Sequence, residues 1–87
     1  MSYYLYILQS KKNGRFYIGQ TKDIQDRLQR HNVGHSKSTK PHRPWELVYS
    51  EEYSTRSEAV KREYKLKSKK SRKYIEYLIE KQDTDDS

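Results

Sequence analysis

The chain opens with two short stretches in which apolar and aromatic residues alternate between two faces. Residues 3–9 and 15–20 are rich in tyrosine, isoleucine and leucine, and the Asn13-Gly14 pair between them is typical of a tight turn. The pattern therefore predicts an antiparallel β-hairpin. Side chains alternate along a strand, so one face of the hairpin is fully apolar and carries Leu5, Ile7, Phe16 and Ile18.

The middle of the chain predicts a helix, a loop and a third strand. Asp23 is a good N-cap for a helix that reaches about Asn32, where apolar residues recur at helical spacing and Gly34 follows. The polar segment 35–44 contains both prolines and is predicted to be a loop. Residues 45–53 then predict a strand in which Leu47 and Tyr49 share one face.

Two further helices and a tail complete the prediction. Thr55 begins a capping box with Glu58 and starts a helix through about Lys69. Ser71 caps a short third helix, and residues 81–87 are expected to form an acidic, disordered tail after a domain of residues 1–80.

The order β-β-α-β-α-α predicts an α+β fold in which helices flank a three-stranded antiparallel sheet. Because three short strands are not stable alone, we expect the helices to cover one face of the sheet, the apolar face of the hairpin.

Composition excludes several classes of protein. The chain has 87 residues and no cysteine, so it has neither a disulfide framework nor a zinc site built on thiolates. No apolar run reaches the roughly 18 residues that a membrane span needs, and the first residues do not resemble a signal peptide. We therefore expect a cytoplasmic protein of one domain.

Positive charge is concentrated in one segment. The net charge is +7, and residues 56–73 alone contain nine basic and two acidic residues. Charge alone is equally compatible with a solvated helix face and with a surface that binds the phosphate backbone of nucleic acid. The basic residues in the second half of this segment are Lys65, Lys67, Lys69, Lys70, Arg72 and Lys73.

Several residues with possible chemistry fall outside the predicted core. Tyr6, Tyr17 and Gly19 share the second face of the hairpin with Tyr4, and the glycine leaves space beside the rings. Arg27 and His31 lie one turn apart on the first helix, so their side chains project together. Glu63 lies on or beside the buried stripe of the second helix, where a carboxylate is unusual.

Together these residues resemble the GIY-YIG nuclease superfamily. Tyr4-Leu5-Tyr6 and Tyr17-Ile18-Gly19 correspond to its two motifs, and the helix residues Arg27, His31 and Glu63 follow at matching places. The resemblance extends from Tyr4 to about Leu78 and is closest to the small, stand-alone members. Excision-repair and homing endonucleases carry the same domain within larger proteins, so DNA repair is one expected setting.

The resemblance implies a role for each residue. Tyr6 corresponds to the general base and Tyr17 to its partner, Arg27 steadies the scissile phosphate, and His31 relays a proton or binds the phosphate. Glu63 corresponds to the ligand of one divalent metal ion, Mg²⁺ or Mn²⁺. The remaining positions that match the small members are Tyr4, Gly19, Asn32, Thr39 and Pro44.

The sequence departs from the family pattern at two places. Tyr4 replaces the first glycine, and residues 74–76 are Tyr-Ile-Glu where several relatives have an asparagine that supports the metal site. A tyrosine is a weak base at neutral pH, so we expect nearby positive charge, including Arg27, to lower the pKa of Tyr6.

The resemblance favours a metal-dependent endonuclease that acts on DNA rather than RNA, directed by DNA structure or only weakly by sequence, as a monomer or weak homodimer. Three alternatives remain open at this point. The tyrosines could be ordinary strand aromatics, Glu63 could simply pair with Arg27 or Lys67, and the fold could serve as a nucleic-acid-binding module that does not cut. A protein-interaction adaptor with a basic helix is a further option.

Overall fold

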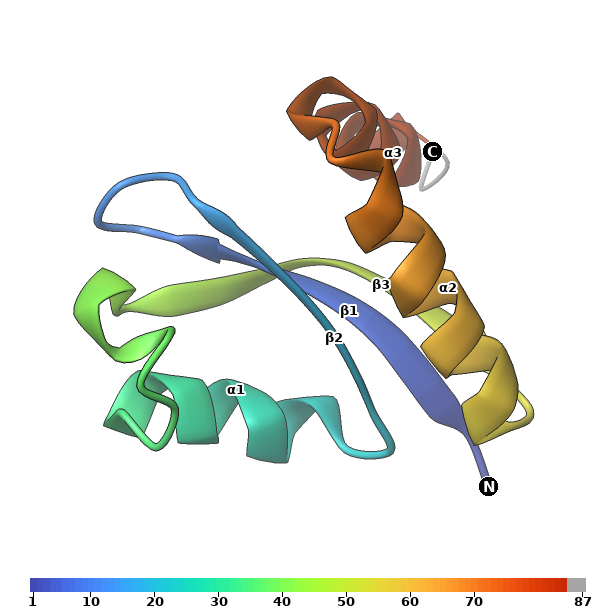
Figure 1. Ribbon diagram of the computed structural model, residues 1–87, viewed down its shortest axis with the longest axis horizontal. Helices are drawn as coiled ribbons and strands as arrows, with labels where there is room; N and C mark the ends of the chain where they lie inside the picture. Colours follow the sequence, from blue (N-terminus) through green and yellow to red (C-terminus); the bar gives the residue numbers. More distant parts are fainter. Residues whose placement is uncertain (85–87) are drawn as a thin grey trace.

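The central strand of the sheet is β1 (Tyr3–Ser10), which pairs with a neighbour on each side. In the computed structural model, which describes residues 1–84, the strand order is β2-β1-β3 (Figure 1). Both β2 (Phe16–Thr21) and β3 (Trp45–Tyr53) run antiparallel to β1. The predicted α+β fold, with element order β-β-α-β-α-α, is confirmed.

The first helix, α1 (Ile24–Val33), begins and ends as its sequence predicts. The Asp23 side chain accepts a hydrogen bond from the Asp26 N–H, at 3.1 Å, and so satisfies a free donor of the first turn. Gly34 ends the helix with φ 88°, a conformation that glycine adopts without strain. The predicted loop that follows contains one turn of 3-10 helix, η1 (Lys40–His42).

The two remaining helices follow one another at the end of the described residues. Thr55 caps α2 (Arg56–Lys69), and the Ser71 side chain accepts from the Tyr74 N–H at the start of α3 (Arg72–Thr84). α3 therefore continues four residues into the segment predicted to be a tail, and residues 85–87 lie outside the described residues. Within residues 1–84, no helix is both long and apolar enough to cross a membrane.

Helices cover both faces of the sheet, so the prediction of a single covered face was wrong. α2 and α3 cover the face of Leu5, Ile7 and Ile18, and α1 lies on the opposite side (Figure 1). The second face has its own core, formed by Tyr6, Leu8 and Trp45 with Ile24 and Leu28 packed against it. The physical reason lies in β1, where four consecutive residues, 5–8, are buried, a pattern that needs apolar cover on both sides.

A bulge in β3 changes which of its residues face the core. Ile7 pairs with Tyr49 and Leu8 with Leu47, so Val48 is the extra residue. Val48 and Tyr49 both pack against the first core, whereas Leu47 is exposed. The prediction that Leu47 and Tyr49 share one face was therefore wrong.

Asn32 joins α1 to β3 through two hydrogen bonds with one residue. Its amide nitrogen donates to the Trp45 carbonyl oxygen at 3.0 Å, and its Oδ1 accepts from the Trp45 N–H at 2.6 Å. This pair fixes the end of the helix against the first residue of the strand.

We predict that Asn32→Ala lowers the free energy of unfolding by about 2 kcal/mol, because two part-buried hydrogen bonds are each worth about 1 kcal/mol. Urea titration followed by circular dichroism measures the change. Asn32→Asp, which keeps the acceptor but removes the donor, should lie between wild type and Asn32→Ala. A loss below about 0.5 kcal/mol in Asn32→Ala would contradict this role.

Candidate active site

The Tyr6 ring lies directly against Gly19, its partner across the hairpin. Tyr6 is 2% exposed, and a Cβ atom at position 19 would stand 2.6 Å from its hydroxyl oxygen and 2.7 Å from Cζ. Real Cβ atoms do not approach ring atoms this closely, so the space above residue 19 is already filled by the tyrosine. Glycine at this position therefore sets where the Tyr6 hydroxyl lies.

His31 is held at both ring nitrogens. Its Nε2 lies 3.3 Å from the Tyr6 hydroxyl, and its Nδ1 lies 2.9 Å from the Thr39 hydroxyl. Thr39 is itself buried, and its carbonyl oxygen accepts from the Trp45 indole N–H at 2.9 Å. Burial, followed by the positive charge of Arg27, lowers the pKa of His31, so the ring is neutral at neutral pH.

Tyr17 completes a cluster of three rings. Its ring centroid lies 4.6 Å from that of His31 and 6.3 Å from that of Tyr6. The two motif tyrosines share one face, as strand alternation predicted, and the helix histidine joins them on the face of the sheet that α1 covers. Tyr4 lies on the same side of β1, two residues before Tyr6, and is half-buried.

Arg27 from α1 and Glu63 from α2 both act electrostatically on Tyr6. Burial raises the pKa of Tyr6, and Tyr17 and the Glu63 carboxylate raise it further, while Arg27 lowers it. Arg27 therefore lowers the pKa of Tyr6 as expected, but the net shift is upward, so the expectation of a lowered pKa overall was wrong. Desolvation of a buried phenol outweighs one guanidinium that is itself exposed to solvent.

Glu63 pairs with Lys67 rather than with Arg27. The Lys67 ammonium lies 2.6 Å from a Glu63 carboxylate oxygen and 5.9 Å from the centre of the Tyr17 ring. The Glu63 side chain is 23% exposed, so it is partly accessible to solvent. Both partners belong to α2, and Lys67 places the pair beside Tyr17 of the ring cluster.

The donor set around Glu63 fits a magnesium-type ion held by one carboxylate. No group of three His, Cys, Asp or Glu residues lies close enough to bind a metal within residues 1–84. A partly exposed single carboxylate suits Mg²⁺, which keeps most of its water and commonly takes further oxygen ligands from a phosphate substrate. Lys67 would have to release the carboxylate when the ion binds.

The predicted backbone-binding residues are all exposed at the junction of α2 and α3. Three of them, Lys67, Lys70 and Arg72, line a groove of about 380 Å³ that also contains Tyr17. The Arg72 guanidinium lies over the Phe16 ring at 4.6 Å. Positive charge is therefore continuous from the ring cluster to the start of α3.

The supporting residues have definite positions. Asn32 and Thr39, which the sequence marked only as matches to a pattern, hold Trp45 and His31 respectively. Sequence reasoning did not identify Trp45 as part of this support, although a buried indole N–H needs a partner and could have suggested it. Residues 74–76 fall in α3, where Ile75 is buried and Glu76 pairs with Arg72 at 3.4 Å.

The sequence and the fold are similar to those of known proteins. Residues 2–75 match the family described as the GIY-YIG catalytic domain. A UPF0213 protein of Staphylococcus saprophyticus is 43% identical over 79 residues, which cover 90% of this chain and 95% of that protein. A UPF0213 protein of Staphylococcus aureus strain N315 is 41% identical over 81 residues, covering 92% and 98%. The solution NMR structure of a UPF0213 protein from Bacillus halodurans is similar with a TM-score of 0.57 at 34% identity, covering 92% of this chain and 84% of that one.

We predict that Gly19→Ala destabilises the protein by about 1–3 kcal/mol, because the new methyl group overlaps the Tyr6 ring. In a Tyr6→Leu background the same substitution should cost much less, since the ring is gone. Urea unfolding of the four proteins in this double-mutant cycle measures the coupling. Equal costs in both backgrounds would show that Tyr6 is not what excludes a side chain.

The lowered pKa of His31 gives a second prediction. Because the folded state favours the neutral ring, acidification below the ordinary pKa of 6.5 protonates His31 in the unfolded chain before it does so in the folded protein. The free energy of unfolding therefore decreases as the pH falls below 6.5. NMR titration should place the His31 pKa below 6.5, and Arg27→Gln should raise it. Titration at or above 6.5 in wild type would refute the buried, neutral ring.

Proposed function

The chain belongs to the GIY-YIG catalytic-domain family, whose members are typically nucleases, and we propose that it is a metal-dependent endonuclease that hydrolyses phosphodiester bonds in DNA. One observation carries the proposal. The buried Tyr6 hydroxyl is hydrogen-bonded to a neutral His31, at a point where the charges of Arg27 and Glu63 both act on it.

Tyr6 and His31 together can remove a proton from water. Burial keeps the Tyr6 phenol protonated at neutral pH, so the oxygen can accept a proton only if it gives up its own. The neutral His31 Nε2, 3.3 Å away, is the acceptor for that proton. As the water oxygen attacks phosphorus and the bond from phosphorus to the departing oxygen breaks, one water proton passes to the Tyr6 oxygen and the Tyr6 proton passes to His31, whose Nδ1 remains bound to Thr39. The departing oxygen takes its proton from solvent water.

The phosphate is held by cationic groups around this pair. Arg27 offers a planar fork that can bind two non-bridging oxygens and stabilise the charge that develops on them. Glu63 would hold one Mg²⁺ or Mn²⁺ ion, and when bound this ion stabilises negative charge on the phosphate and on the departing oxygen. Lys67, once released from Glu63, is a further cation beside Tyr17.

The exposed lysines at the α2–α3 junction, together with Arg72, would bind the flanking phosphates. Such contacts carry no sequence information, so we expect cutting that depends on DNA structure or only weakly on sequence. We expect DNA rather than RNA as substrate, a monomer or weak homodimer, and a cytoplasmic location. Binding should weaken steeply with salt, because each neutralised phosphate releases counterions.

The proposal predicts metal-dependent cutting that is lost in two variants. Labelled single-stranded, duplex, flapped and branched DNA is incubated at low salt with Mg²⁺, Mn²⁺ or EDTA. Tyr6→Phe removes the proton acceptor and Glu63→Gln the metal ligand, so each should slow cutting at least about 100-fold. Tyr64→Phe and Glu46→Gln are matched controls on exposed residues and should cut like wild type.

A different result would favour the alternative function. If wild type binds the panel but leaves every substrate uncut with either metal, the chain is better described as a nucleic-acid-binding module. If it cuts and Tyr6→Phe cuts equally fast, the assignment of Tyr6 is wrong even though the activity stands.

A further inference from the structure

α2 is held to the sheet by few apolar contacts. Its buried residues are Ala59 and Leu66, two turns apart, and the turn between them carries Arg62 and Glu63. Successive residues of a helix are about 100° apart, so these two side chains leave the buried stripe on opposite flanks. One flank faces β3 and the other faces β2.

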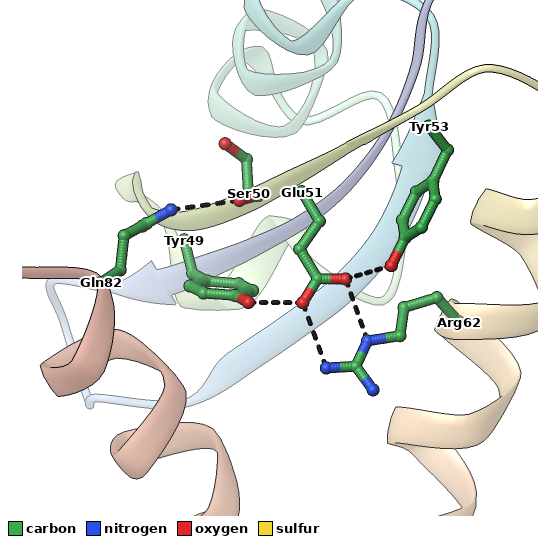
Figure 2. A network of polar contacts seen from close by, with 6 residues as sticks. All are labelled: Tyr49, Ser50, Glu51, Tyr53, Arg62 and Gln82. Carbon is green, nitrogen blue, oxygen red and sulfur yellow. Dashed lines mark hydrogen bonds and ion pairs between the residues drawn. The ribbon is translucent and has the colours of Figure 1, made fainter. Parts of the chain in front are cut away.

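On the β3 flank, Arg62 is bound to a carboxylate that has no free acceptor direction left. Arg62 donates to the two Glu51 oxygens from Nε at 2.9 Å and Nη2 at 3.1 Å. The hydroxyl groups of Tyr49 and Tyr53 donate to the same carboxylate, one to each oxygen (Figure 2). We call Tyr49, Glu51, Tyr53 and Arg62 the Glu51 cluster.

The Glu51 cluster is more shielded from water than the other ion pairs. The side chains of Glu51 and Arg62 are only 18% and 19% exposed, whereas the other ion pairs between residues 1 and 84 each include a side chain about half exposed or more. Burial raises the pKa of Glu51, but the hydrogen bonds from Arg62, Tyr49 and Tyr53 outweigh it and hold the carboxylate ionised. A bidentate pair of this kind fixes orientation as well as distance.

On the opposite flank the same turn of α2 carries the candidate metal ligand. Glu63 pairs with Lys67, whose ammonium lies 5.9 Å from the Tyr17 ring. The rotation of α2 about its axis therefore sets both the hydrogen bonds of Arg62 with Glu51 on β3 and the distance of Glu63 from the ring cluster. The tip of a side chain lies about 5–6 Å from the helix axis, so a rotation of about 20° moves it by about 2 Å.

We propose that Glu51 and Arg62 are positioning residues for the active site: their bidentate pair fixes the rotation of α2, and thereby places Glu63 and Lys67 beside Tyr17. This inference rests on the proposed function for the role of Glu63, but not for the placement of α2. A displacement of 1 Å can cost about 100-fold in rate, so a clamp on the far flank matters for catalysis.

The test removes the clamp without leaving an unpaired charge. The double variant Glu51→Gln/Arg62→Met loses both charges together, and Arg62→Lys keeps the charge but loses the fork. Thr55→Ala is the control: it removes the N-cap of α2, and so destabilises the same helix, without touching the Glu51 cluster. All variants are compared at a temperature where urea titration shows them fully folded.

Two readouts separate placement from metal binding. In the metal-free protein, NMR cross-relaxation between the Lys67 side chain and the Tyr17 ring reports the rotation of α2. Binding of Mn²⁺ is measured through the paramagnetic broadening that the ion causes at the Gly19 and Lys67 amides. Glu63→Gln, which lacks the candidate metal ligand, is the reference for this measurement. We expect the double variant to lose the cross-peak and to bind Mn²⁺ at least tenfold more weakly, Arg62→Lys to be intermediate, and Thr55→Ala to match wild type.

The outcomes distinguish the two claims. If the cross-peak and Mn²⁺ affinity persist in the double variant, or fall equally in Thr55→Ala, the clamp does not position α2 and the inference is overturned. If the cross-peak is lost but wild type and Glu63→Gln bind Mn²⁺ alike, the placement of α2 stands and the proposed metal role of Glu63 fails. If the double variant does not fold, Arg62→Lys alone is the test. A weakened cross-peak then supports the inference, and an unchanged cross-peak overturns it.

Discussion

The close approach of the Tyr6 ring to Gly19 is the constraint on which the candidate site depends. With the ring filling the space above residue 19, the phenol hydroxyl is buried and needs a hydrogen-bond partner. His31 supplies that partner, and its other nitrogen is in turn fixed by Thr39. Burial of this chain of polar groups raises the pKa of Tyr6 and lowers that of His31, so both groups are neutral before substrate binds.

The placement of helices on both faces of the sheet explains how so short a chain builds such a site. β1 is buried on both faces, so a residue and its neighbour serve different cores: Leu5 and Ile7 pack under α2 and α3, while Tyr6 and Leu8 pack against α1. The site draws Arg27 and His31 from one layer and Glu63 from the other. It therefore depends on how each helix is fixed to the sheet, by Asn32 for α1 and by the Glu51 cluster for α2.

Local signals in the sequence were enough to predict most elements. The Asn13-Gly14 turn, the Asp23 and Thr55 caps and the strand from Trp45 to Tyr53 follow from short-range backbone and side-chain preferences, and the structure confirms them. Strand alternation predicted that Tyr6 and Tyr17 share one face, whereas only the resemblance to the GIY-YIG family implied that His31 joins them; the catalytic roles of all three stay proposals.

Features that depend on long-range pairing could not be predicted in this way. The bulge at Val48 determines which side chains of β3 face α2, and nothing in residues 45–53 alone marks it. Arg62 lies eleven residues after Glu51, and their pairing depends on that register and on the rotation of α2. Composition and spacing alone therefore do not predict it. The cover over the second face was missed for a related reason, because Leu8 was not recognised as buried.

The central claim is that one phosphate can lie between the Tyr6–His31 pair, Arg27 and a metal ion on Glu63. A crystal structure of the Tyr6→Phe variant with a short DNA strand and Mn²⁺ tests it most directly, because anomalous scattering locates the metal without reference to the fold. We predict one Mn²⁺ ion bound to the Glu63 carboxylate and to an oxygen of a phosphate that Arg27 also contacts, with Lys67 no longer paired to Glu63. A phosphate bound only at the α2–α3 junction, or a metal ion that does not contact Glu63, would contradict the account.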